Sequence, residues 1–116
     1  LLAMFVWMQN HPEETRSVVS SLGMEDLQIF LHKQLRAVME PIVDQHSIDL
    51  RVTEDDRVFV TDHFTLAILG HISQWLATGM STDPYILTER IARVLDGQVR
   101  RSLELFASSP HPPARA

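Results

Sequence analysis

The sequence predicts an all-α protein, and three features support this fold class. Apolar residues in the long segments recur every three or four positions, which is the period of an amphipathic helix. Proline and glycine separate these segments at positions where helices usually begin and end. The alternation typical of strands occurs only weakly, over residues 47–53, and a lone strand would have no partner. We therefore expect a bundle of about five helices.

Length and composition exclude several classes of protein. The chain has 116 residues, of which 45% are hydrophobic, and this suffices for one domain with one core. It contains no cysteine, which excludes a disulfide framework, a thiolate zinc site and a cysteine nucleophile. Ten basic against fifteen acidic side chains give a net charge of −5, which argues against a nucleic-acid-binding surface. No apolar run is long enough to span a membrane.

The first helix is expected at residues 1–10, within the apolar run LLAMFVWM. This run lacks the basic residues and the cleavage site of a signal peptide, so it is typical of a buried helix. Because the chain begins inside this run, we interpret it as a piece of a longer protein. A second helix begins at Pro12, where a proline at the first helical position and two acidic residues after it are favourable. It ends at Gly23, which we expect to adopt a left-handed conformation.

A third helix is expected over residues 24–46, opened by an acidic pair in its first turn. Pro41 lies inside this segment and lacks the backbone N–H that would bond to the preceding turn. We therefore expect a kink or break near residues 37–40. Residues 47–53 then form a linker.

Two more helices follow the linker. Thr53 and Asp56 resemble a capping box with Asp in place of Glu, which predicts a long helix over residues 54–78 that ends at Gly79. Asp83 caps a last helix over residues 84–106 that begins at Pro84. Residues 1–106 would then form one domain, followed by a disordered tail at 107–116.

The helix at 54–78 is apolar on two faces, which indicates that both faces are buried. One face carries bulky residues and should contact the core. The other carries smaller residues, and a domain of this size lacks the material to cover it, so we expect a second copy of the chain to do so. A twofold interface requires such a self-complementary face, and we expect the last two helices of each copy to form a four-helix bundle. The predicted interface consists of Ala67, Gly70, His71, Gln74, Ile91, Leu95 and Gln98.

A small-molecule site is typically apolar with a few polar groups, and Gln34 fits that description. It falls within the apolar arc of its predicted helix, where an unpaired amide would cost free energy. We expect a cavity between helices 1–10, 24–46 and 54–78 that accepts an uncharged or weakly polar molecule, because no lysine or arginine lies on these arcs. The candidate ligand-binding residues are Phe5, Met8, Phe30, Gln34, Met39, Phe59 and His63. Core packing is the alternative for Phe30 and Met39, and a place at an edge or interface is the alternative for Gln34 and His63.

The remaining motifs argue against catalysis, a cofactor and a metal. The sequence has no nucleophile elbow, no His-Glu-x-x-His motif and no glycine-rich phosphate loop. Its six histidines include no pair spaced by four residues. His63 and His71 are separated by about 12 Å along a helix, which is too far for one ion. We also interpret the pair Arg100-Arg101 as part of a solvated face.

The stretch FTLAILGHISQWLATGMSTDPYILTERIARVLDG, residues 64–97, resembles the C-terminal domain of TetR-type transcriptional regulators. The resemblance lies in a helix of small and apolar residues that carries Gly70, then Trp75-Leu76, Gly79, and an acid and proline that open an amphipathic helix. The upstream pattern HPEETRSVVSSLGMEDLQIFLHKQLRAVMEPIV resembles the middle helices of that family, so the resemblance covers about residues 1–106.

This resemblance implies a ligand-sensing domain of a cytoplasmic regulator. Such domains bind a small effector among their middle helices, dimerise through their last two helices and control an N-terminal helix-turn-helix domain that binds operator DNA. The sequence has no helix-turn-helix segment, so operator binding would belong to another part of the protein and this fragment would bind no nucleic acid. The alternative is an all-α module that forms the same dimer but binds a protein partner and no small molecule.

Overall fold

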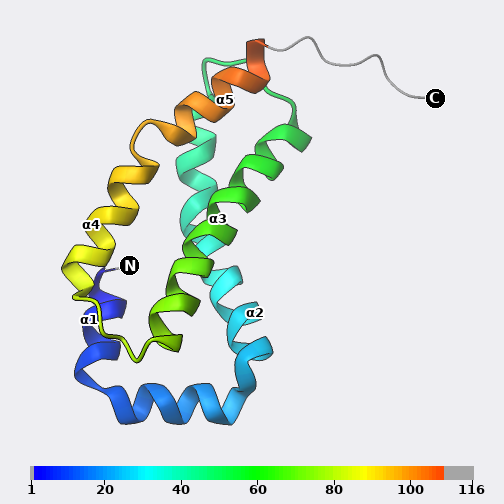
Figure 1. The fold of residues 1–116 in the computed structure, drawn as a ribbon. Helices are drawn as coiled ribbons and strands as arrows, with labels where there is room; N and C mark the ends of the chain where they lie inside the picture. The colour runs from blue at the N-terminus through cyan, green and yellow to red at the C-terminus, as the bar shows by residue number, and fades with distance from the viewer. Residues whose placement is uncertain (1, 109–116) are drawn as a thin grey trace.

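The computed structural model describes residues 2–108, and the secondary structure in that range consists of helices without strands. This confirms the all-α fold class. Figure 1 shows how the helices follow one another. Their bounds are α1 Leu2–Asn10, α2 Pro12–Ser47, α3 Glu54–Ala77, α4 Pro84–Leu95 and α5 Gln98–Ser108.

The predicted boundary at Gly23 is confirmed as a sharp turn inside α2. Gly23 has φ 78° and ψ 159°, a backbone conformation that a residue with a Cβ rarely adopts. Before it, α2 lies across one end of the molecule, and after it α2 runs along the length of the molecule beside α3 (Figure 1).

Of the kink or break expected near residues 37–40, the break is absent, because within α2 only Gly23 has non-helical backbone angles. Pro41 and Ala37 are both exposed. The carbonyl group that Pro41 leaves without a helical donor therefore lies on the solvent side, where water can replace the lost hydrogen bond. This position lets the helix continue through the proline to Ser47.

Both predicted N-terminal caps are present. The Thr53 side chain accepts a hydrogen bond of 3.1 Å from the backbone N–H of Asp56 and caps α3. The Asp83 carboxylate accepts one of 2.8 Å from the N–H of Tyr85 and caps α4. Between these two helices the Trp75 indole N–H donates to the carbonyl of Thr82 over 2.9 Å, which fastens the turn that joins them.

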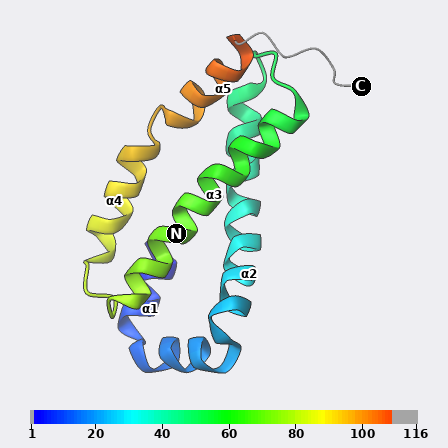
Figure 2. The same cartoon turned by 45° about the vertical axis from the view of Figure 1, so that its right-hand side comes forward.

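The single helix expected over residues 84–106 is wrong. The chain leaves the helical conformation at Asp96, whose ψ is 116°, and Gly97 has φ 75°. As a result α4 and α5 are two helices that meet at a corner (Figure 2). The corner lets α4 pack against α1 while α5 packs against both α2 and α3. We refer to α4 and α5 together as the arm.

The core lies mainly between α2 and α3, with the arm and α1 closing its ends. Buried residues recur at every fourth position along α2, and the buried face of α3 meets them. Phe5 of α1 is fully buried and contacts Trp75 edge to face, with ring centroids 5.0 Å apart. The main members of the core are Leu27, Leu31, Leu35, Met39 and Val43 of α2, Val60, Phe64, Ile68, Ile72 and Trp75 of α3, and Val99 and Leu103 of α5.

Candidate functional site

One face of α3 is open to solvent and includes two small residues, Ala67 and Gly70. Ala67, Gly70, His71 and Gln74, four of the predicted interface residues, are all exposed on this helix. A Cβ added at Gly70 would meet no atom within 4 Å. We call this surface, together with the edge of the arm beside it, the α3 face. A second helix could approach it closely at Ala67 and Gly70, because these residues have no long side chain to keep the two backbones apart.

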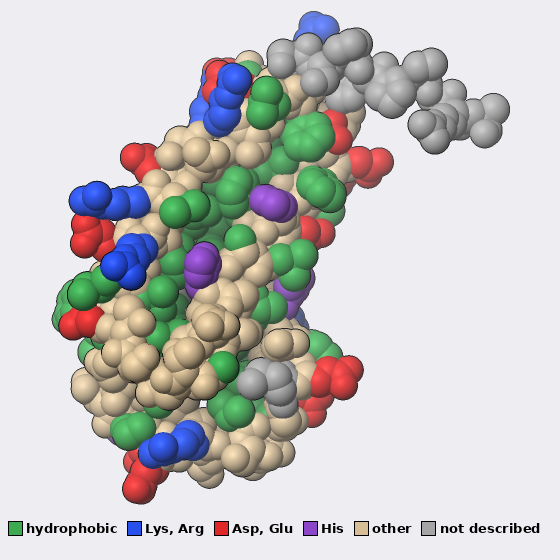
Figure 3. All heavy atoms as spheres, viewed as in Figure 1, with side chains coloured by type: hydrophobic (Ala, Val, Ile, Leu, Met, Phe, Trp, Pro, Cys, Tyr) green, Lys and Arg blue, Asp and Glu red, His purple; other side chains and the backbone are tan. Residues whose placement is uncertain are grey.

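A groove of about 250 Å³ runs along the α3 face between α3 and the arm. Figure 3 shows hydrophobic side chains along this line, with histidine side chains among them. Five of the seven predicted interface residues line the groove, namely Ala67, His71, Ile91, Leu95 and Gln98. Ile91 is buried at its base, whereas Gln98 is exposed. The structure therefore brings most of the predicted interface into one continuous surface.

Of the predicted ligand-binding residues, His63 lines this groove and Phe59 lies beside it. Phe59 is 62% exposed and stacks on His63, with ring centroids 6.4 Å apart. Phe59 also meets Phe106 of α5 edge to face at 6.3 Å. His63 lines both the groove and a smaller hollow next to it that Phe59 and Phe106 share. Their position extends the α3 face toward the end of the arm.

The other predicted ligand-binding residues are dispersed. Phe5 is in the core and Met8 packs against it, while Phe30 and Gln34 are exposed on the outer side of α2. The five residues expected to line one cavity, Phe5, Phe30, Gln34, Phe59 and His63, therefore do not surround a common space in the part of the chain that the structure describes. The assignment of these residues to one ligand site stays a prediction, and the structure places them at different positions in the fold.

The placement of Phe30 and Gln34 has a geometric reason. The residues of α2 that contact α3 follow a ridge of every fourth position, which moves around the helix by about 40° at each step. A fixed apolar arc does not follow that ridge. Phe30 and Gln34 each precede a buried leucine, Leu31 and Leu35, by one position, and so they fall outside the contact.

A cleft of about 500 Å³ lies between the C-terminal part of α2 and the corner of the arm. We call it the α2–arm cleft. It exists because the arm bends at Gly97, so α5 reaches α2 while α4 stands away from it. Its lining comprises Met39, Ile42 and His46 of α2, Glu89, Ala92, Arg93 and Leu95 of α4, Asp96 and Gly97 at the corner, and Val99 and Arg100 of α5.

Among the predicted ligand-binding residues, Met39 lines this cleft. The predicted ligand-binding set does not include the other lining residues. Those of the arm are absent from it because residues 84–106 were expected to form one straight helix, in which Leu95 was assigned to the dimer interface. The dipeptide Asp96-Gly97 was the available signal, since Asp-Gly is typical of a turn.

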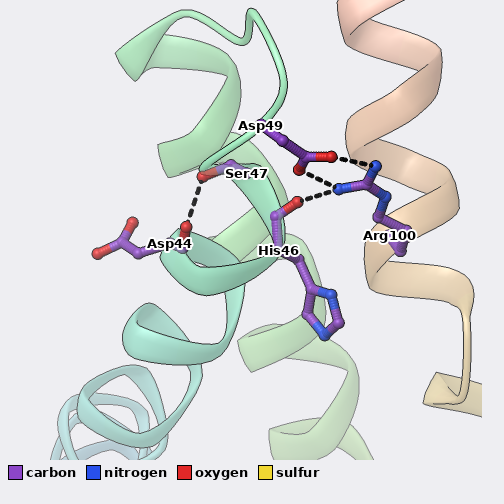
Figure 4. A network of polar contacts seen from close by, with 5 residues as sticks. All are labelled: Asp44, His46, Ser47, Asp49 and Arg100. Atoms are coloured by element: carbon purple, nitrogen blue, oxygen red, sulfur yellow. Dashed lines mark hydrogen bonds and ion pairs between the residues drawn. The ribbon is translucent and has the colours of Figure 1, made fainter.

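Arg100 joins the arm to the end of α2 beside this cleft. Its guanidinium donates to the carbonyl of His46 at 2.7 Å and to both carboxylate oxygens of Asp49, at 2.6 and 3.0 Å (Figure 4). The hydrogen bonds from Arg100 to the carboxylate are the main reason that the pKa of the Asp49 carboxyl lies below its usual range. In the same network the Ser47 hydroxyl donates to the carbonyl of Asp44 at 2.9 Å. Arg100 is therefore a structural contact, and its interpretation as part of a solvated face was incomplete.

Within residues 2–108 no three histidine or acidic side chains are grouped so that they could hold a metal ion. In the same range no helix is both long and apolar enough to cross a membrane.

Comparison with known proteins identifies the family of this fold. Residues 1–97 match the family model TetR_C_8, described as a transcriptional regulator C-terminal region. Neither a curated protein nor a solved structure matches the chain significantly. The match covers α1 to α4, and it agrees with the resemblance carried by the stretch around Gly70 and Trp75. The chain belongs to the family of TetR-type transcriptional regulator C-terminal domains.

Proposed function

We propose that this chain is the dimerising and effector-sensing domain of its regulator. In this proposal two copies associate through their α3 faces, and a small molecule bound in the α2–arm cleft shifts the arrangement of the dimer. That shift controls operator binding by a helix-turn-helix domain of the same regulator. Family membership supports the regulatory role. The α2–arm cleft supports effector binding, and the groove on the α3 face supports dimerisation.

The observation that carries the dimer is the exposure of apolar side chains around the small residues of the α3 face. Phe59 and Leu66 of α3 and Val94 of α4 are 62%, 56% and 66% exposed. Large side chains of this kind favour burial by about 1.5–3 kcal/mol each. A second copy would bury them, because apolar residues surround a strip of small ones on a face that can meet itself.

The α2–arm cleft supports effector binding by its position as well as its volume. It touches α2, α4 and α5, so a molecule bound there contacts both the core helix and the arm. The arm also forms one edge of the α3 face. A ligand that favours one position of the arm would therefore favour one arrangement of the two copies, which is the differential contact that allosteric control requires.

Cysteine crosslinking tests the dimer directly, since the natural chain has no cysteine. We would make the single variants Ala67→Cys, Gly70→Cys and Gln74→Cys along the α3 face. A disulfide needs Cβ atoms about 3.5–4.5 Å apart, so a residue crosslinks to its own copy only near the twofold axis. Val38→Cys is the matched control, because Val38 is 63% exposed on α2.

The expected result is rapid oxidation of at least one α3-face variant to a covalent dimer in dilute solution, while Val38→Cys stays monomeric on a denaturing gel. If none of the three crosslinks faster than Val38→Cys, the two copies do not meet through this face and the proposed dimer is wrong.

A further inference from the structure

The α2–arm cleft has an apolar floor and a charged rim. Met39 and Ile42 form its α2 side, and Leu95 and Val99 form its arm side. Met39 and Val99 are buried, Leu95 is partly buried and Ile42 is 40% exposed. These side chains favour a ligand with a compact hydrocarbon body. The charges on the rim then determine which polar group on such a ligand is favoured.

Each cation on the rim already has an anionic partner. Arg93 pairs with Glu89 at 3.0 Å along α4, and both side chains line the cleft. Arg100 is held by the carboxylate of Asp49 at 2.6 Å and by the carbonyl of His46. A carboxylate ligand would have to displace Glu89 or Asp49 to reach either arginine.

Asp96 is the remaining charge on the rim, and neither of these ion pairs includes it. It lies at the corner between α4 and α5, it is exposed and lines the cleft, and among the ion pairs of residues 2–108 none includes it. Glu89, Arg93, Asp96 and Arg100, with Asp49 as the partner of Arg100, sum to one negative charge. The net charge of −5 on the chain adds to the attraction for a cation.

We propose that the α2–arm cleft takes a hydrophobic amine, with its apolar body against the four floor residues and its ammonium group beside Asp96. This inference rests on the proposal that the cleft is the effector site, and it names the chemical class of the effector. It replaces the uncharged effector expected from the sequence, which assumed a different set of lining residues. The apolar contacts supply most of the affinity, and Asp96 supplies selectivity, because an exposed ion pair contributes little by itself.

Three probes with the same body test the proposal: 1-adamantylamine, 1-adamantanol and 1-adamantanecarboxylate. Each would be titrated into the natural chain at pH 7 and low salt, with the amide resonances of the ¹⁵N-labelled protein as the readout. The resonances of Ala92, Gly97 and Val99 locate binding in the cleft. We expect the amine to bind about threefold more tightly than the alcohol and about tenfold more tightly than the carboxylate, in line with an exposed ion pair.

Asp96→Asn is the decisive variant, and Glu25→Gln is its matched control. Both remove one negative charge from an exposed side chain, but Glu25 lies near the start of the long segment of α2 and not in the cleft. Asp96→Asn should bring the affinities for the amine and the alcohol to within a factor of about 1.5 of each other, with the alcohol affinity unchanged. Glu25→Gln should keep the preference for the amine.

Each failure has a distinct meaning. If the alcohol and the amine bind the cleft equally in the natural chain, or if Asp96→Asn keeps the preference, the inference about the amine is wrong and the cleft remains an effector site. If all three probes leave the resonances of the cleft unmoved at millimolar concentration, both the amine inference and the proposed effector cleft are overturned.

Discussion

The guanidinium of Arg100 holds the carboxylate of Asp49 through two hydrogen bonds, across 51 residues of sequence. This contact joins α5 to the turn that follows α2, and a third hydrogen bond to the carbonyl of His46 secures the end of α2 itself. It holds α5 against the end of α2 at the edge of the α2–arm cleft.

Arg100→Ala should lower the melting temperature in a manner that depends on pH. The pKa of Asp49 is lowered from 3.8 mainly by its hydrogen bond to Arg100, so this pair stabilises the folded state above about pH 4. The contribution is lost as the pH falls through the lowered pKa. The difference in melting temperature between the natural chain and the variant should therefore be constant from pH 5 to 7 and shrink below pH 4.

Scanning calorimetry over that pH range measures the difference. Arg101→Ala is the control, because it removes the neighbouring arginine, which is exposed and takes part in no ion pair described for residues 2–108. A difference for Arg100→Ala that is the same at pH 3 and pH 7 would show that the ion pair with Asp49 does not stabilise the fold.

Phe5→Ala should destabilise the domain by about 3–5 kcal/mol, because Phe5 is fully buried and its removal leaves a cavity beside Trp75. Phe30→Ala removes the same side chain from an exposed position and should change the stability by less than about 0.5 kcal/mol. Urea denaturation followed by tryptophan fluorescence compares the two variants. Equal losses would mean that α1 does not close the core as described.

Gly97→Ala should destabilise the corner of the arm by about 1–2 kcal/mol, since Gly97 has φ 75° and an alanine is strained there. Gly97→Asn should recover part of the loss, because asparagine tolerates this conformation. The melting temperatures of the natural chain and the two variants give the order of stability. An alanine variant as stable as the natural chain would indicate that α4 and α5 can form the single straight helix expected from the amphipathic pattern.

Much of the fold was predictable because local signals agree with it. The turn at Gly23, the caps at Thr53 and Asp83, and the positive φ of Gly79 just after α3 each depend on a few neighbouring residues, and all of them are present. The last helix was predicted with an end at Phe106, whereas α5 continues to Ser108. Most of the tail expected to be disordered, from residue 109 onward, lies outside the described residues.

The errors arose where packing between helices decides the outcome. An amphipathic pattern stays nearly in phase across Asp96-Gly97, so it conceals the corner that creates the α2–arm cleft. Gln34 lies in an apolar arc but outside the inclined ridge that meets α3, and no single-helix projection distinguishes the two. The exposed face with Ala67 and Gly70 depends on small residues and a lack of charge, which are local properties of α3, and its role as an interface stays a prediction.

Association of two copies through the α3 face is tested most directly by the mass of the protein in solution. Light scattering at micromolar concentration should give about twice the 13.2 kDa of one chain. Gly70→Arg places a charge where the two helices meet, at a cost of about 3–5 kcal/mol if it is buried without a partner, and should give the mass of one chain. Gln28→Arg adds the same charge to an exposed position on α2 and should remain dimeric. A natural chain that is monomeric, or a Gly70→Arg variant that dimerises as the natural chain does, would contradict the account.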